Sequence, residues 1–231
     1  MDGKLTGVGV GPGDPELLTL KAVRIIKECD VAAVPVKEVS ESVAYQIARG
    51  AVPELENKEV LAIDMPMTKD KEVLHASHMA GADQLEAMIK NGKKIAFLTL
   101  GDPTVYSTYL YLHKEIKRRG YETEIISGIP SFCAVAAKLN EGLVERAEQL
   151  HVIPASYHLE EALSLPGTKV LMKAGKKIAK VKQAVLAHDE DVMMIENCGM
   201  ENEKIYTGAE EIPDSAGYYS LIIVKDKISE K

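Results

Sequence analysis

The hydrophobic and polar positions of the chain form two kinds of segment that alternate along it. Short segments that are apolar or β-branched at consecutive positions predict strands, and longer segments with apolar residues every three to four positions predict helices. Consecutive apolar positions are typical of strands that have helices on both faces of their sheet, so the pattern predicts an α/β fold. The predicted strands begin at Leu5, Asp30, Glu59, Lys94, Glu122, Leu150, Lys169, Val192 and Ser220, and the predicted helices span residues 15–28, 42–52, 78–92, 108–120, 131–139 and 175–188.

The final third of the chain has a different pattern. Strand segments crowd together after Ala187 with little helix between them, which favours antiparallel neighbours and a mixed sheet. Upstream, a basic helix ends at Arg119 and is followed by Gly120, and a glycine in this place is typical of a helix C-terminus. We therefore expect two closely joined α/β domains, one over residues 1–119 and one with a mixed sheet over residues 120–231.

Composition and charge restrict the class of protein. The chain has 231 residues, of which 46% are hydrophobic, enough for one large core or two modest ones. Its net charge of −7 argues against a general nucleic-acid-binding protein, because binding to phosphate backbones depends on clustered Lys and Arg. No apolar run approaches the roughly 20 residues of a membrane span, and the N-terminus lacks the pattern of a signal peptide. We expect a cytoplasmic protein that does not bind membranes.

Neither the cysteines nor the histidines indicate a metal site. Cys29, Cys133 and Cys198 are odd in number and far apart, which fits neither a disulfide framework nor a paired zinc motif, and we interpret them as reduced packing residues. His75 and His78 are three residues apart in a helical segment, a spacing that can place two ligands on one face. Because no Cys or carboxylate stands at a matching spacing, we expect this pair to face solvent.

Three strand-to-helix turns contain glycine: GVGVGPGD over residues 7–14, GDPTVY over residues 101–106 and SGIPS over residues 127–131. The first turn fits no register of the dinucleotide motif G-x-G-x-x-G, and the chain has no P-loop motif. Open α/β sheets bind ligands at the carboxyl ends of their strands, where glycine lets a ligand approach the backbone. The three turns therefore predict a ligand site.

The same turns also have a purely structural interpretation. Asp14 before Pro15 is typical of a helix N-cap, Asp102 or Thr104 would accept hydrogen bonds from a following helix, and Ser131 would cap the next one. Both interpretations stay open from the residues alone. An acidic turn at Asp102 suits a cationic or polyhydroxylated ligand better than a phosphate.

Three tyrosines follow the second of these turns. Tyr106, Tyr109 and Tyr111 lie within one and a half helical turns, and the first two would share a helix face. We expect some of them to pack in the core. Tyr106 is the functional candidate because it is nearest the turn.

Five motifs occur in order along the chain: LTGVGVGPGDPELLTLKAVRIIKECDVAAVP, FLTLGDPTVYST, SGIPSFCAVAA, HVIPAS and VLMKAG. Together they strongly resemble the tetrapyrrole methylases, which are S-adenosylmethionine-dependent enzymes that methylate corrin and sirohaem precursors. The stretches PMTKD, TLGDPTVYSTYLYL and SGIPSFCAVAAKL are most similar to the branch that methylates carbon 20 of precorrin-2, or of its cobalt-containing counterpart, in cobalamin synthesis. The similarity runs from about Leu5 to about Lys173 and continues more weakly to the end.

The resemblance implies two α/β domains with S-adenosylmethionine in a cleft at their junction, a tetrapyrrole substrate and a homodimer. It also implies cofactor-binding residues by position, and a floor at the GPGD turn where cofactor and macrocycle meet. The implied cofactor-binding residues are Val10, Pro12, Gly101, Asp102, Val105, Tyr106, Ser131, Phe132, Met172, Cys198 and Ser220, and the floor adds Gly13 and Asp14. Related sirohaem-type members have Met-Gly where this chain has Met172-Lys173, which leaves the role of Lys173 open.

The chemistry that the resemblance implies is an in-line displacement, in which an electron-rich carbon attacks the methyl group and a neutral thioether leaves. We expect the protein to supply mainly proximity and orientation, and no nucleophilic triad. A His or Tyr base would assist the loss of the ring proton, but the sequence selects none. The substrate carries many carboxylates, and Lys37 and Lys69 lie in loops where cations would meet them, although each also fits a solvated surface lysine.

Two alternatives stay open beside methylation of carbon 20. One is methylation of another tetrapyrrole carbon, or of a non-tetrapyrrole substrate, by a member of the same family. The other is an α/β module that binds a nucleotide or anion through its glycine turns without catalysis. Binding of S-adenosylmethionine in preference to ATP and NAD distinguishes a methylase from such a module.

Overall fold

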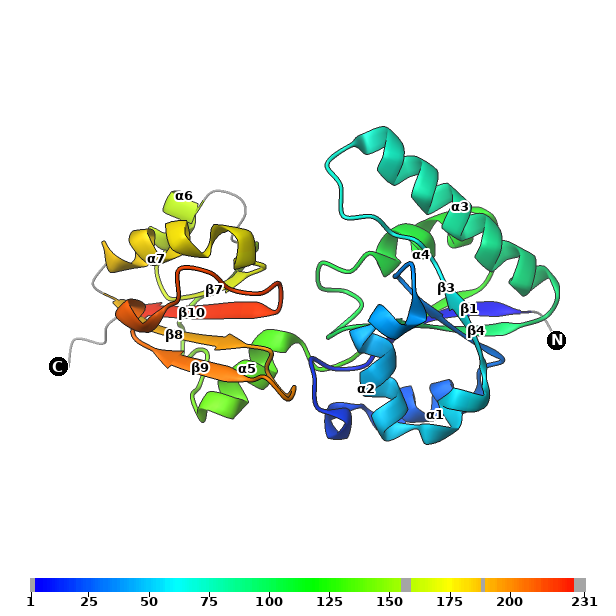
Figure 1. The fold of residues 1–231 in the computed structure, drawn as a ribbon, viewed down its shortest axis with the longest axis horizontal. Helices are drawn as coiled ribbons and strands as arrows, with labels where there is room; N and C mark the ends of the chain where they lie inside the picture. Colours follow the sequence, from blue (N-terminus) through cyan, green and yellow to red (C-terminus); the bar gives the residue numbers. More distant parts are fainter. Residues whose placement is uncertain (1–2, 155–158, 188–189, 227–231) are drawn as a thin grey trace. The chain divides into compact units, whose positions relative to one another are not determined.

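The computed structural model describes residues 3–154, 159–187 and 190–226. They form two compact units, Met1–Pro130 and Ser131–Lys231, each with its own sheet and hydrophobic core (Figure 1). The predicted α/β architecture with a mixed C-terminal sheet is confirmed.

The division between the units lies after the boundary expected at residues 119 and 120. Strand β5 (Thr123–Ile126) pairs in parallel with β1 (Lys4–Gly9), so the chain returns to the first sheet before it leaves the first unit. Gly120 does end the preceding helix, with φ of +90°. This glycine therefore marks a connection inside the first unit, and the units divide after Pro130.

The first unit contains a parallel five-stranded sheet, whose strands lie in the order β3 (Glu59–Ala62), β2 (Val31–Val34), β4 (Lys94–Thr99), β1 and β5. Successive side chains of a strand point to opposite faces of the sheet, so the residues of each strand belong in turn to two buried clusters, one on each face. In β2, Val31 and Ala33 belong to one buried cluster and Ala32 and Val34 to the other.

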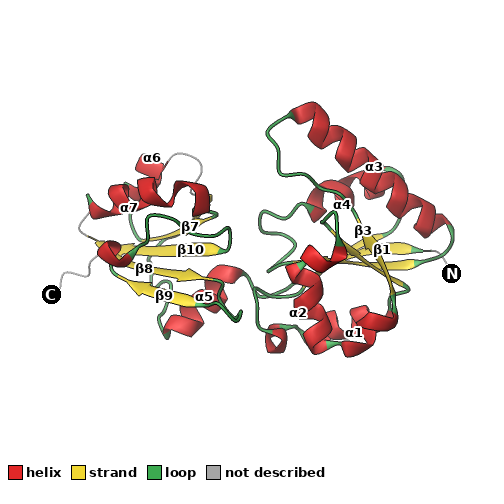
Figure 2. Cartoon of the chain, viewed as in Figure 1, coloured by secondary structure: helices red, strands yellow, loops and turns green. Residues whose placement is uncertain are grey.

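Two helices cover each face of this sheet (Figure 2). Helices α1 and α2 pack on one face and helices α3 and α4 on the other, so the strands are buried on both sides as their apolar runs predicted. The bounds are α1 (Leu20–Glu28), α2 (Val43–Ala51), α3 (Lys71–Lys90) and α4 (Tyr109–Arg118), with short 3-10 turns η1 (Pro15–Leu17), η2 (Val39–Glu41) and η3 (Pro53–Asn57).

The neighbouring strands β1 and β4 lead to helices on opposite faces. The chain leaves β1 for α1 and leaves β4 for α4, which makes the ends of these two strands a topological switch point. Ligands of open α/β sheets bind at such a point, outside the carboxyl ends of the strands. The first two glycine turns of the sequence both lie here.

The second unit contains a mixed sheet in the order β6-β7-β10-β8-β9. Strand β6 is parallel to β7, whereas β10 is antiparallel to β7 and β8, and β9 is antiparallel to β8. Helix α5 covers one face, and α6 and α7 cover the other. The bounds are α5 (Ser131–Leu139), β6 (Leu150–Pro154), α6 (Leu159–Leu163), β7 (Thr168–Met172), η4 (Gly175–Lys177), α7 (Ile178–Leu186), β8 (Glu190–Glu196), β9 (Lys204–Thr207), η5 (Ala209–Glu211) and β10 (Ser220–Asp226).

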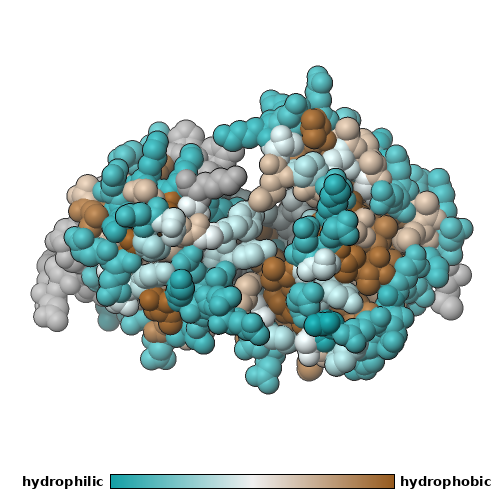
Figure 3. All heavy atoms as spheres, in the orientation of Figure 1, coloured by the Kyte–Doolittle hydropathy of each residue, from teal (hydrophilic) through white to brown (hydrophobic). Residues whose placement is uncertain are grey.

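Hydrophilic side chains are spread over the visible face of each unit, with hydrophobic side chains exposed between them (Figure 3). Within the described residues, no helix combines the length and apolar character that a membrane crossing requires.

Candidate functional site

The three turns predicted as ligand sites meet in the first unit. They form the first loop group, defined as residues 10–14, 100–106 and 127–128, at the carboxyl ends of the adjacent strands β1, β4 and β5. The backbones of the first two turns are joined directly. The amide of Gly101 donates to the carbonyl of Gly11 at 2.8 Å, and that of Gly11 donates back at 3.3 Å.

Glycine is required where these backbones approach. A Cβ atom added to Gly128 would lie 2.2 Å from the carbonyl oxygen of Gly101, and one added to Gly9 would lie 2.6 Å from the same oxygen. Both distances are too short for real side-chain contacts. Gly101 itself has φ of +69°, the left-handed region that glycine adopts without strain. The glycines therefore bring the three strand ends together.

Asp102 joins two of the loops through its side chain, which is 7% exposed. One carboxylate oxygen accepts hydrogen bonds from the amide and hydroxyl of Thr104, at 2.7 and 2.5 Å, and the other accepts from the amide of Gly128 at 3.0 Å. Burial raises the pKa of Asp102, but hydrogen bonds from Thr104, Gly128 and Ser127 together outweigh burial and lower it below its usual value. The carboxylate is thus ionised and points into the protein as a clamp between loops.

Tyr106 and Tyr109 do not share a helix face, contrary to the expectation from their spacing. Tyr106 precedes α4 with φ of +49° and is 46% exposed, whereas Tyr109 begins the helix and is fully buried. The hydroxyl of Ser107 makes the difference, because it accepts a hydrogen bond from the amide of Tyr109 and bonds to Thr99 at 2.8 Å. Tyr106 is therefore presented on the surface of the loop group, beside the half-buried Val105.

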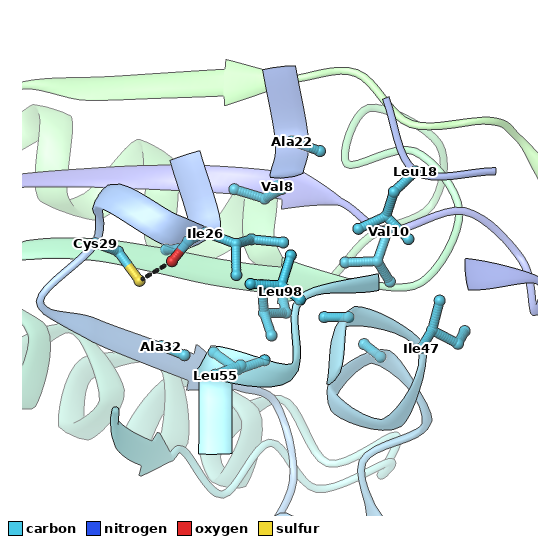
Figure 4. Packing of buried hydrophobic residues seen from close by; sticks show 14 of the residues in the cluster. Val8, Val10, Leu18, Ala22, Ile26, Cys29, Ala32, Ile47, Leu55 and Leu98 are labelled. Carbon is cyan, nitrogen blue, oxygen red and sulfur yellow. Dashed lines mark hydrogen bonds between the residues drawn. The ribbon is translucent and has the colours of Figure 1, made fainter. Parts of the chain in front are cut away.

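The GPGD turn has the capped geometry that the sequence allowed. The carboxylate of Asp14 accepts a hydrogen bond from the amide of Glu16 at 2.8 Å, and Pro15 is the first residue of η1. Pro12 and Gly13 are buried. The side chain of Val10 lies in the core beside Leu18 (Figure 4).

The two candidate substrate lysines are exposed at the same edge of the first sheet. Lys37 follows β2, and Lys69 follows β3 just before α3. Because all five strands are parallel, these positions share the carboxyl edge with the first loop group. Both cations therefore lie in loops that follow strand ends at the same edge of the sheet as the first loop group.

A second loop group lies in the second unit, at the end of its sheet where β7 and β8 end and β10 begins. We define it as residues 172–175, 196–199 and 216–220. Phe132, Met172 and Cys198 pack against the same buried cluster under α5, so three side chains predicted from separate motifs come together. Ser131 is the first residue of α5, and Ser220 is buried.

Gly217 is the centre of the second loop group. Its amide donates to the carboxylate of Glu196 at 2.9 Å, and its carbonyl accepts from the hydroxyl of Ser220 at 2.6 Å. The amide of Asn197 donates to the carbonyl of Tyr219 at 2.9 Å. Lys173 has φ of +59°, and its ammonium lies 6.0 Å from the ring centre of Tyr218.

The sequence analysis did not identify Glu196, or Tyr206, Tyr218 and Tyr219 near it, as candidate site residues. The available signal was an acidic residue at the end of the otherwise apolar strand VMMIEN. Glu196 is only 8% exposed, and its second carboxylate oxygen accepts from the hydroxyl of Tyr206 at 2.9 Å. An isolated acidic residue in a strand has no partner that the sequence identifies.

The structure corrects two expectations about the cysteines and histidines, one for Cys133 and one for His78. Cys29 is buried, and its thiol donates to the carbonyl of Ile26, but Cys133 is exposed on α5 and is not a packing residue. His75 is exposed, whereas His78 stacks on Tyr111 with ring centres 4.5 Å apart instead of facing solvent alone. Among the described residues, no three His, Cys, Asp or Glu side chains gather as metal ligands.

The chain is similar in sequence to known proteins along nearly its whole length. The chain is 38% identical, over 228 residues that span 96% of both sequences, to a probable cobalt-precorrin-2 C(20)-methyltransferase of Methanocaldococcus jannaschii. It is 31% identical, across 97% of both sequences, to the cobalt-precorrin-2 C(20)-methyltransferase of Salmonella typhimurium.

The fold has solved counterparts. The uroporphyrin-III C-methyl transferase of Thermus thermophilus, solved in complex with S-adenyl homocysteine, superposes with a TM-score of 0.68 at 22% identity and covers 96% of this chain and 97% of that one. A likeness at this identity shows the fold alone. The family model of the tetrapyrrole (corrin/porphyrin) methylases matches residues 4–213, and the chain belongs to this family.

Proposed function

We propose that this protein transfers a methyl group from S-adenosylmethionine to carbon 20 of precorrin-2 or of cobalt-factor II, its cobalt-containing counterpart, in cobalamin biosynthesis. The observation that carries the proposal is the match over nearly the whole length to two relatives that bear this activity in their names. Cobalt, where present, belongs to the macrocycle and is part of the substrate.

Each loop group by itself offers candidate residues for binding of the cofactor. In the first loop group, the side chains of Tyr106, which is exposed, and Val105, which is half-buried, are accessible to a ligand, whereas Val10, Pro12 and Gly101 are buried and would contribute through their backbone. In the second unit, the candidates are Ser131 and Phe132 of α5 and Met172, Cys198 and Ser220 of the second loop group, and Phe132, Met172 and Cys198 pack against one buried cluster. When bound, the cofactor supplies the methyl group as a sulfonium, and the residues of the chain hold and orient it.

Asp102 acts by position rather than by contact. Both of its oxygens accept hydrogen bonds from the protein, so its charge is used to hold the turn of Thr104 against Gly128. The clamp keeps the backbone of Gly101 in place for the ligand.

The carboxylates of the macrocycle meet Lys37 and Lys69, with Gly13 and Asp14 at the floor of the site. Support comes from the position of both lysines on the carboxyl edge of the first sheet and from their exposure. Exposed cations recognise carboxylates without a large desolvation cost. We further propose a cytoplasmic homodimer, on the strength of the family resemblance, which light scattering of the purified protein tests.

The decisive experiment is anaerobic incubation of the purified protein with S-adenosylmethionine and either precorrin-2 or cobalt-factor II, with the products analysed by mass spectrometry and NMR. We expect a gain of one methyl group on one of the two substrates, located at carbon 20. Methylation at another carbon would move the protein to another branch of its family. Tight binding of S-adenosylmethionine without methylation of either compound would contradict the substrate.

The lysines are tested separately from the cofactor. Lys37→Ala and Lys69→Ala should raise KM for the macrocycle about threefold to tenfold each, as expected for the loss of one charge contact, with unchanged affinity for S-adenosylhomocysteine. Lys93→Ala is the matched control, because Lys93 is also exposed but precedes β4 at the opposite edge of the sheet. Equal KM values for all three variants would remove both lysines from the substrate site.

A further inference from the structure

Three segments of the second unit are held together at one glycine. Gly217 donates its amide hydrogen to Glu196 and accepts at its carbonyl from Ser220. A Cβ atom added to Gly175 would lie 2.6 Å from the carbonyl oxygen of Gly217, so the segment after β7 also packs closely on it. The loop that precedes β10 is therefore fixed by contacts with the ends of β7 and β8.

Glu196 supplies the buried charge in this arrangement, since its side chain is more than nine-tenths buried. A buried carboxylate is costly unless hydrogen bonds replace its lost water. Here the amide of Gly217 and the hydroxyl of Tyr206 each donate to a different oxygen, both at 2.9 Å. Hydrogen bonds to an ionised acceptor are stronger than neutral ones, so the carboxylate fixes the peptide of Gly217 firmly.

The fixed peptide of Gly217 orients the residues on its C-terminal side. Tyr218 and Tyr219 come next, with their rings 5.3 Å apart and nearly perpendicular, and both remain partly exposed. The carbonyl of Tyr219 accepts from the amide of Asn197, next to Cys198. The conformation of Gly217 therefore influences the positions of Cys198 and Ser220, two residues that we propose to bind the cofactor.

We infer that Glu196 is a positioning residue for S-adenosylmethionine, whose carboxylate holds the loop of residues 217–220 in the conformation that binds the cofactor. The inference rests on the proposed function. Glu196 has a counterpart in the first unit, where the buried carboxylate of Asp102 accepts from the amide of Gly128. In each unit a buried carboxylate fixes a glycine of a neighbouring loop.

The test compares Glu196→Ala with Glu196→Gln. Glu196→Ala should weaken binding of S-adenosylhomocysteine about tenfold or more by calorimetry, and raise KM for S-adenosylmethionine more than it lowers kcat, because the loss of a charge-assisted hydrogen bond frees the loop. Glu196→Gln should restore most of the affinity, because its amide oxygen accepts from Gly217 and its amide nitrogen donates to the hydroxyl of Tyr206. Hydrogen exchange of the peptide spanning residues 213–220 should accelerate in the alanine variant only.

Asp226→Asn is the matched control. Asp226 also accepts from a glycine amide, that of Gly167 at 2.7 Å, and from the buried Lys169, but it lies at the opposite end of the same sheet. This variant should lower the melting temperature without changing the affinity for S-adenosylhomocysteine. Equal losses of affinity in Asp226→Asn and Glu196→Ala would show general destabilisation and overturn the inference.

The remaining outcomes separate this inference from the proposed function. If the wild-type protein does not bind S-adenosylhomocysteine, the proposed function fails. If the wild-type protein binds and Glu196→Ala binds within twofold, the inference alone fails. Should Glu196→Ala not fold, Tyr206→Phe replaces it, because it removes only the second hydrogen bond. We then expect about threefold weaker binding and faster exchange at residues 213–220, and no change in either would overturn the inference.

Discussion

Gly128 lacks a side chain at the point where the ends of β1, β4 and β5 meet. Replacing it with alanine would place a Cβ atom 2.2 Å from the carbonyl oxygen of Gly101, and the backbone would have to move. We expect Gly128→Ala to lower the free energy of unfolding by about 3 kcal/mol and to weaken cofactor binding, since overpacking against backbone is poorly accommodated. Urea denaturation and calorimetry measure the two effects.

The chain offers a control of the same chemistry. A Cβ atom at Gly142 has no neighbour within 4 Å, and Gly142 is exposed. Gly142→Ala should therefore leave the free energy of unfolding within about 0.5 kcal/mol of the wild type, as for other exposed sites. If both alanine variants behave alike, the close approach at Gly128 does not constrain the loop group.

The clamp at Asp102 predicts a pH dependence. The pKa of Asp102 is lowered in the folded protein by its hydrogen bonds, so the stabilisation is present above the ordinary pKa of the group and is lost as the pH falls through the lowered value. At pH 7, Asp102→Asn should cost about 1–3 kcal/mol of unfolding free energy, the range for disrupting a buried hydrogen bond.

Urea denaturation of the wild type and Asp102→Asn at pH 7, 5 and 3.5 checks this sign. The difference should be the same at pH 7 and 5 and smaller at pH 3.5. A difference that grows as the pH falls would mean that the carboxylate is protonated in the folded protein, and would contradict the clamp.

At the scale of elements, helix α4 packs on strand β1 through one matched pair. The ring of Tyr109 occupies the place of a side chain at Gly7, where a Cβ atom would lie 2.1 Å from the ring. The hydroxyl of Tyr109 also donates to the carbonyl of Glu124 on β5 at 2.9 Å. The helix therefore contacts two neighbouring strands through a single side chain.

This pair predicts a non-additive double mutant. Gly7→Ala should cost about 3 kcal/mol of unfolding free energy through overpacking, and Tyr109→Leu a similar amount through the lost ring and hydrogen bond. In the double variant the smaller leucine makes room for the new methyl group, so the combined cost should be smaller than the sum. Thermal and urea unfolding of the three variants tests it, and strictly additive costs would show that the two residues do not share this space.

The elements that sequence patterns predicted well are those whose own residues carry the signal. Strand β4 and helix α4 have apolar residues at the expected spacing. Strand β9 was missed because it has little apolar signal: Ile205 is 46% exposed, and the strand exists through its pairing with β8. Helix α3 begins earlier than expected because Asp70 caps it, accepting from the amides of Glu72 and Val73, while its first turns are polar.

At the scale of the whole molecule, the position of β5 decides where the chain divides. The fragment 1–130 retains all five strands of the first sheet and both of its buried clusters. The fragment 1–119, which ends at the boundary expected from the helix before Gly120, lacks β5. Strand β1 would then become an exposed edge, and Asp102 would lose the amide of Gly128.

We therefore expect fragment 1–130 to unfold cooperatively on heating, and fragment 1–119 to aggregate or to lose cooperative unfolding. Circular dichroism at 222 nm and size-exclusion chromatography of both fragments provide the measurement. Equal cooperativity in the two fragments would place the division where the sequence pattern put it.

The sequence by itself determined the α/β class, the mixed second sheet, the positions of the glycine turns and the family resemblance, because each of these is carried by neighbouring residues. Only the tertiary structure decided the roles of Asp102 and Glu196. Their partners Gly128 and Gly217 lie 26 and 21 positions away along the chain. No local pattern specifies such pairs, because the hydrogen bonds form only after the strands have paired and water has been excluded from their ends.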